Sequence, residues 1–225
     1  MSGSLLGFPA GGLSLSPTGT LAAQTPDNGV AGGSPRGANA VDLQTTRTAS
    51  TQVASGAASV VAGGQSNTAA GVGAASLGGS SNNAASNNSV VAGGSSNLTT
   101  NDNAGVFAGA SNIANGGSAV VLGGVFNNAS GLFSYTLGGQ RAATRGIHAR
   151  GAWAGNRIAA DGDAQCGQHV LLRQTTDATA TRLTADGAAP GAANQIVLPN
   201  FGRYGGILTV VAGGAGANKI GRAHV

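Results

Sequence analysis

The chain is short of the residues on which most protein chemistry depends. It contains one cysteine, Cys166, so it can form no internal disulfide and no cysteine-based metal site. It has no glutamate, charged residues make up 8% of it and aromatic residues 4%, and between residues 48 and 140 the only charge is Asp102. A surface this neutral requires that most of it be covered or that its sheet edges be closed.

Long apolar runs are also missing, and we expect no leader sequence. No run approaches the eighteen apolar residues of a transmembrane helix, and the first four residues lack the basic start of a secretory signal. The formal net charge of +4 comes mostly from arginines near residues 141 to 157. Because nucleic-acid binding normally requires a basic face interleaved with aromatic residues, the sequence predicts neither a nucleic-acid partner nor membrane insertion.

What the chain does have in quantity is glycine, which follows a strict period. Its 41 glycines and 6 prolines make up about a fifth of 225 residues, below the roughly 25–30% typical of unstructured compositions. From Gly63 to Trp153 the pattern repeats every fifteen residues, with an asparagine after each of the first five glycine-containing pairs. The structural repeat positions are Gly63, Gly64, Asn67, Gly78, Gly79, Asn82, Gly93, Gly94, Asn97, Asn112, Gly123, Gly124, Asn127, Gly138 and Gly139.

A fixed period of this length predicts an all-β fold, a parallel β-roll or solenoid of fifteen-residue coils. Each coil would contain two short strands and two tight corners. Apolar strands are expected just before the paired glycines, at residues 59–62, 89–92, 119–122 and 134–137. The glycines suit a corner where positive φ or close backbone approach excludes a Cβ. The asparagines, stacked at about 4.8 Å per coil, are expected to form a side-chain amide ladder.

Both faces of these strands carry small or apolar residues, which is typical of a strand buried on both sides. One face would line the coil interior, whereas the other needs a cover that no predicted helix supplies. The simplest cover is an identical chain related by a rotation axis. We therefore expect a homotrimer or, failing that, another cyclic oligomer.

The sequence divides into four parts. Residues 1–47, rich in Gly, Pro and Ser, are predicted to be a linker or N-terminal segment, and residues 48–155 the β-roll repeat domain. Residues 156–219 are predicted to begin a small antiparallel β domain that is cut short. Its expected strands are 168–173, 181–184, 195–198 and 207–211. Residues 220–225 match one reading frame of a common sequencing adapter, so we predict that they are not biological.

The repeat Ser-Val-Val-Ala-Gly-Gly-x-x-Asn-x-Ala-x-Gly resembles the head repeats of trimeric autotransporter adhesins. Those heads are left-handed parallel β-rolls whose three chains pack around a common axis. The resemblance covers about residues 48–155, with a period of fifteen rather than the slightly shorter spacing usual in that family. A second set of segments looks like a domain that follows such repeats in tailed-phage fibre and other virion proteins, at residues 162–165, 170–173, 175–179, 183–187 and 194–200.

Together these resemblances imply a structural, host-attaching component of a phage tail fibre, located in the virion. It would be a trimeric rod that presents a distal receptor-binding domain, with a host glycan or lipopolysaccharide as partner. One alternative is the head of a bacterial trimeric autotransporter adhesin at the cell surface, which would bind host surfaces or extracellular matrix. Another is a self-cleaving fibre with a C-terminal chaperone-like protease.

The titratable residues form no recognisable catalytic constellation, and we expect neither enzyme activity nor a cofactor or metal. Asp161 and Asp163 flank a glycine, which is typical of a turn rather than of a carboxylate pair. His148 and His169 stand apart in sequence from cysteine and acidic partners. The sequence contains no nucleophile elbow, phosphate-binding loop or calcium-binding nonapeptide pattern.

Four arginines near the end of the repeat are the candidate ligand-binding residues: Arg141, Arg145, Arg150 and Arg157. In a trimer they would form a ring of about twelve guanidinium groups, suited to acidic sugars or lipopolysaccharide phosphates. The alternative is a solvated collar that pairs with Asp161 and Asp163. Trp153 takes the position of the first glycine of the seventh coil. We expect it to cap the open end of the roll rather than to stack on a sugar.

Overall fold

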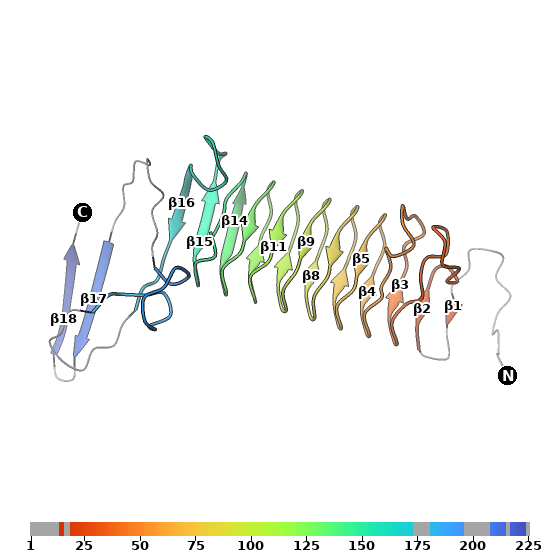
Figure 1. Ribbon diagram of the computed structural model, residues 1–225, viewed down its shortest axis with the longest axis horizontal. Helices are drawn as coiled ribbons and strands as arrows, with labels where there is room; N and C mark the ends of the chain where they lie inside the picture. Colours follow the sequence, from red (N-terminus) through yellow and green to blue (C-terminus); the bar gives the residue numbers. More distant parts are fainter. Residues whose placement is uncertain (1–13, 16–18, 173–180, 196–207, 215–216, 224–225) are drawn as a thin grey trace.

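The computed structural model describes residues 14–15, 19–172, 181–195, 208–214 and 217–223. These residues contain no helix, and their short strands stack into a rod (Figure 1). The predicted all-β solenoid is therefore confirmed, with about eight turns and an antiparallel strand pair near the end of the chain.

Each coil contributes a strand to one long sheet, and the regular coils contribute a second strand to a shorter one. The long sheet has the order β1-β2-β3-β4-β6-β8-β10-β12-β14-β15-β16. Its strands are β1 (Ser14–Leu15), β2 (Leu21–Ala22), β3 (Val41–Asp42), β4 (Val60–Val61), β6 (Ala75–Ser76), β8 (Val90–Val91), β10 (Gly105–Val106), β12 (Val120–Val121), β14 (Tyr135–Gly139), β15 (Gly151–Ala154) and β16 (Gln165–Gln168). The shorter sheet contains β5 (Thr68–Ala69), β7 (Asn83–Ala84), β9 (Leu98–Thr99), β11 (Ile113–Ala114) and β13 (Asn128–Ala129).

The stack begins nearer the N-terminus than residue 48. From β4 to β14 each strand pairs in parallel with a strand fifteen residues further on. In the same sheet Leu21 pairs with Val41, and Val41 with Val60. Part of the predicted segment 1–47 therefore belongs to the solenoid. Loops inserted into the first two coils lengthen them and hide the period there.

The parallel stack gives way to antiparallel pairing after β15. Strand β16 pairs antiparallel with β15, and β17 (Leu208–Gly214) pairs antiparallel with β18 (Ala217–Ala223). The strand predicted at 168–173 lies earlier, as β16, and Leu172 instead makes an isolated antiparallel bridge with Thr184. Most of the strand predicted at 195–198 lies outside the described residues. The non-biological origin of residues 220–225 remains a prediction.

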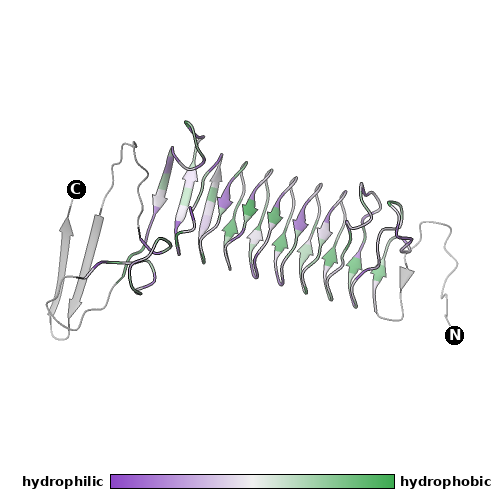
Figure 2. Ribbon diagram, in the orientation of Figure 1, coloured by the Kyte–Doolittle hydropathy of each residue, from purple (hydrophilic) through white to green (hydrophobic). Residues whose placement is uncertain are grey.

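The interior of the rod is filled by small side chains of the chain itself. The inward position of the long sheet is occupied by Val61, Ser76, Val91, Val106, Val121 and Thr136, all at most 1% exposed. Alanines of the shorter sheet and corners complete this core. Figure 2 shows hydrophobic residues in the strands of successive coils. The interior therefore needs no neighbouring chain, whereas the prediction of strands buried on both sides is not met within one chain, since Val90 remains 37% exposed.

Candidate functional site

The five repeat asparagines form a hydrogen-bonded ladder inside the rod, and each is at most 1% exposed. The Oδ1 atom of Asn97 accepts the backbone N–H of Asn112 at 3.0 Å, one coil further on. Its Nδ2 atom donates to the carbonyl oxygens of Gly93 and Gly109, each at 2.9 Å. Equivalent bonds recur at the other four asparagines.

The predicted ladder is thus present, but it joins side chains to backbone rather than side chain to side chain. The corner leaves the N–H of each asparagine without a backbone acceptor, so the side chain of the preceding coil takes that role. Gln44 starts the ladder, because its Oε1 accepts the N–H of Asn67 at 2.8 Å and its Nε2 donates to the Asn67 carbonyl at 2.7 Å. The fifteen-residue spacing does not reveal Gln44, which lies twenty-three residues before Asn67.

The second glycine of every pair is required by the chain itself, and among the first glycines Gly138 also has a positive φ, of +140°. Gly94 has φ of +87°, and a Cβ there would lie 2.0 Å from the carbonyl oxygen of Gly109. The other second glycines share this geometry: Gly64, Gly79, Gly109, Gly124 and Gly139. At Gly78 and Gly93, in contrast, φ is not positive and a Cβ would meet no heavy atom within 4 Å. The predicted steric reason therefore fails for these first glycines, since their outer side is open.

The first glycines border a continuous apolar surface on the long sheet. We call this surface the outer face, defined by the two outward positions of each strand and the following glycine position. One column contains Val60, Ala75, Val90, Gly105, Val120 and Tyr135, and the other contains Ala62, Leu77, Ala92, Phe107, Leu122 and Leu137. Phe107 is 55% exposed, and no charged residue lies in either column. Leu21 and Val41 continue the surface toward the N-terminus.

The shorter sheet presents a different outer surface. Its outward positions mix polar and apolar residues: Thr68, Asn83, Leu98, Ile113 and Asn128, with Ala70, Ala85, Thr100, Asn115 and Ser130 beside them. Monomeric proteins seldom expose a long contiguous apolar surface, whereas scattered apolar side chains are normal. The two sheets of one coil therefore differ in what they expose, and only the long sheet has a surface suited to burial.

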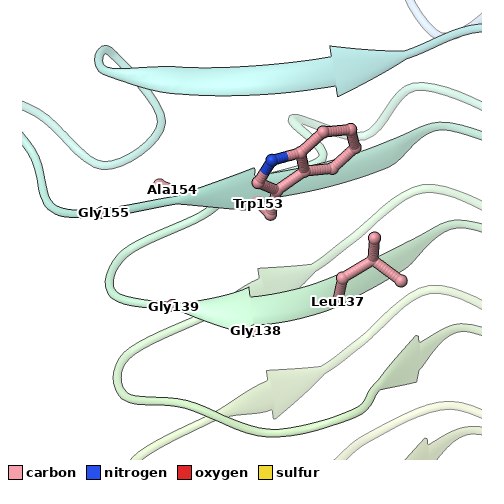
Figure 3. A pocket seen from close by; sticks show the side chains of 6 residues that line it. All are labelled: Leu137, Gly138, Gly139, Trp153, Ala154 and Gly155. Atoms are coloured by element: carbon pink, nitrogen blue, oxygen red, sulfur yellow. The ribbon is translucent and has the colours of Figure 1, made fainter.

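Trp153 belongs to the outer face rather than to the interior. Trp153 follows the inward-facing Ala152 and pairs with Gly138 after a register shift, and it is 40% exposed. Figure 3 shows it beside Leu137, over a depression that these two residues line together with Gly138, Gly139, Ala154 and Gly155. The predicted role as a cap is wrong, because the interior at this level is closed by small residues: Ala142, Ala152 and Ala154.

Three of the four candidate arginines, from the connections before and after β15, gather around Asp161 and Gly162. Arg141 and Arg157 both form ion pairs with Asp161, at 3.2 and 3.1 Å, and Arg145 donates to the carbonyl of Gly162 at 2.6 Å. The Arg141 guanidinium also lies 4.5 Å from the centre of the Phe126 ring. The structure thus contains the Asp161 pairing expected of a collar, and it leaves two guanidinium groups facing one carboxylate.

Arg150 and Asp163 lie apart from these ion pairs. Arg150 is only 7% exposed, and burial lowers its pKa, with a smaller contribution from the charge of Arg145. Asp163 accepts backbone N–H bonds from residues 158, 159 and 160, which lower its pKa to about 2. Asp163 therefore holds a turn, as expected of an aspartate beside glycine, and does not pair with the arginines as the collar interpretation expected.

A buried ion cluster at the N-terminal end was not foreseen. Asp42 takes the inward position that Val61 has one coil later, and it pairs with Arg36 at 2.9 Å and with Arg47 at 3.2 Å. All three side chains are fully buried. Arg47 also donates to the carbonyls of Gln44 and Gln52, each at 3.0 Å. Since these partners come from inserted loops, neither periodicity nor local spacing indicates the cluster.

Comparisons with protein-family models, curated proteins and solved structures found no match to this chain. In the part of the chain that the structure describes, no three His, Cys, Asp or Glu residues lie together as metal ligands would. Nor do the described ranges include a helix long and apolar enough to span a membrane. The family resemblance given above therefore rests on the quoted residues alone.

Proposed function

We propose that this chain is a structural component of a tailed-phage tail fibre, a homotrimeric rod that extends from the virion and presents a distal receptor-binding domain. The observation that carries the proposal is the apolar outer face of the long sheet. The interior of the rod is already filled by its own side chains, so the fold of the single chain does not require an apolar outer face. Covering it by association removes apolar area from water.

The size of the outer face fits an interface between chains. Eight consecutive parallel pairings from β2 to β15, at about 4.8 Å each, give a length of about 38 Å. Four residues of extended chain make it about 13 Å wide, or about 500 Å² in projection. This lies at the upper end of the largest apolar patches on monomers. Because the accessible area of a corrugated face exceeds its projection, it is comparable to the roughly 800 Å² that each partner contributes to a stable complex.

A second copy of the chain is the partner that matches this surface best. The outer face repeats every 4.8 Å or so along the rod, so a complementary partner needs the same repeat over the same length. Another solenoid of this sequence has that repeat. The absence of charge on both columns means that identical faces meet without repulsion. Cyclic closure of three rods covers every face and leaves the mixed surface of the shorter sheet in solvent.

A trimeric rod of this kind supports attachment by reach and by avidity. Three copies of a distal domain engage a repetitive cell surface more tightly than one copy does. The cluster of Arg141, Arg145 and Arg157 around the loop between β15 and β16 would be present three times, with two guanidinium groups for each Asp161 carboxylate. The excess positive charge suits acidic glycans or lipopolysaccharide phosphates. The second candidate, a bacterial adhesin head, is favoured by the Ser-Val-Val-Ala-Gly-Gly repeat itself.

The gene's flanking DNA separates the two candidates. Tail and baseplate genes beside it would support the phage fibre. An upstream signal peptide with a downstream coiled-coil stalk and membrane β-barrel would support the adhesin. Flanking genes of neither kind would overturn both. Binding of the purified chain to bacteria tests the arginines: Arg141→Glu with Arg157→Glu should abolish binding, and intact binding would remove them from the proposal.

A further inference from the structure

The two columns of the outer face alternate in side-chain size along four consecutive strands of the long sheet. On one strand the first outward residue is larger than the second, and on the next strand it is smaller. The pairs are Val60 with Ala62, Ala75 with Leu77, Val90 with Ala92, and Gly105 with Phe107. The interior column shows no such regular reversal, since Val91, Val106 and Val121 follow one another there. The alternation is therefore a property of the exposed side of the sheet.

Gly105 is the extreme case, and nothing within the chain requires a glycine there. Its neighbours in the ladder are Val90 and Val120, so a glycine separates two valines of one column. Its φ is not positive, and the nearest heavy atom to a Cβ built there is the Val90 carbonyl oxygen, 4.0 Å away. Glycine inside a strand weakens it and often marks the close approach of something else. On the outer face, Gly105 leaves a hollow.

Phe107 supplies a side chain of the kind that fills such a hollow. It follows Gly105 by two residues, on the same side of the strand, and it is 55% exposed. We propose that Phe107 of one copy inserts over Gly105 of the neighbouring copy, at the same level of the rod. The proposal rests on the homotrimer put forward above. It adds the contact: because rotation about the three-fold axis places each coil beside the same coil of its neighbour, the large side chain of one copy faces the small one of the next.

The alternation selects this register over its neighbours. In register, the large side chain of each of these four strands meets the small one of the same strand in the next copy, all around the three-fold axis. A shift by one coil would bring Phe107 against Val90 or Val120 and leave small residues facing each other elsewhere. Overlap at one level and voids at the next are both unfavourable in close-packed interfaces.

The substitution Gly105→Val tests the inference, because the single chain and the assembly predict opposite effects. In one chain, valine is favourable in an extended strand between two valines. In the trimer it fills the hollow, so the concentration at which half of the trimer dissociates should rise by about tenfold or more. Phe107→Ala should also weaken assembly. The double variant recreates the Val-x-Ala pattern of residues 60–62 and should assemble better than Gly105→Val alone.

Ala70→Val is the matched control, since Ala70 is exposed beside the shorter sheet and should have no effect on assembly. Sedimentation across a dilution series measures the assembly, and circular dichroism checks that each variant remains folded. A Gly105→Val trimer as stable as the wild-type trimer would overturn the insertion of Phe107 over Gly105 while leaving the homotrimer in place. A folded wild-type monomer throughout the series would overturn the proposed assembly itself.

Discussion

Removing one asparagine of the internal ladder should destabilise the rod by an amount that the structure sets. In Asn97→Ala, the N–H of Asn112 loses its only acceptor in a position that is fully buried. An unsatisfied buried donor of this kind costs about 1–3 kcal/mol. The Gly109 carbonyl retains its bond from the Ser95 N–H at 2.9 Å, and the half-buried Gly93 can reach water, so both add little.

We therefore expect Asn97→Ala to lower the free energy of unfolding by about 2–3 kcal/mol. At about 2–4 °C per kcal/mol for a chain of this size, Tm should fall by about 4–12 °C. Circular dichroism during heating measures this, with the chain concentration held constant because assembly also shifts Tm. Asn83→Ala is the control: it removes the same atoms, but the Oδ1 of Asn83 has no hydrogen-bond partner. Its effect should stay within about 0.5 kcal/mol.

Asn97→Asp separates the donor from the acceptor. The aspartate retains an oxygen for the Asn112 N–H but turns a second oxygen toward two carbonyls in place of the Nδ2 donor. It should therefore be more destabilising than alanine at neutral pH, and burial should raise its pKa. The loss should diminish as the pH falls through that raised pKa, because the protonated acid donates again. Equal Tm values for Asn97→Ala and Asn83→Ala would refute the ladder as a source of stability.

Three further predictions follow from the contacts described above. Gly94→Ala should cost at least about 1–3 kcal/mol, because its Cβ would meet the carbonyl of Gly109. Gly93→Ala should lower Tm much less, since a Cβ there meets no atom of its own chain; similar melting of the two variants would argue against this difference. Asp42→Asn should lower the free energy of unfolding by about 3–5 kcal/mol, because it leaves two buried arginines without a counter-charge. Backbone hydrogen exchange should become faster in the first two coils, and unchanged protection there would contradict the prediction. The Asp163 carboxyl should titrate in an NMR experiment near pH 2, so the turn it holds is fully stabilised above the unfolded value of about 3.9 and is lost as pH falls toward 2; a midpoint near 3.9 would be inconsistent with the backbone bonds.

Periodicity carried most of the fold prediction, because a fifteen-residue repeat has few structural solutions. The positions of Asn67 and Gly64 could be assigned to a corner from spacing alone, and the structure places both there. Where the coils differ in length, the spacing of residues no longer predicts which positions align. The first two coils carry insertions, so neither the start of the stack at Leu21 nor the burial of Asp42 could be recognised from the sequence.

The site predictions failed where the outcome depends on which side of a strand a residue occupies. Trp153 was expected at the end of the interior, but it follows the inward-facing Ala152 in β15, so the alternation of the strand turns it outward. The first glycines of the pairs cannot be told from the second ones in sequence. The structure shows that a Cβ at Gly93 would meet no heavy atom within 4 Å. Ion pairs such as those of Asp161 involve partners from separate loops, and no local pattern chooses between alternative arginines.

The mass of the folded chain in solution tests the central claim most directly. That claim is that the outer face of the long sheet is covered by two further copies of the same chain. Native mass spectrometry or sedimentation equilibrium at working dilution should find three times the chain mass of 21.3 kDa, about 64 kDa. A well-folded species of 21.3 kDa under the same conditions would contradict the account.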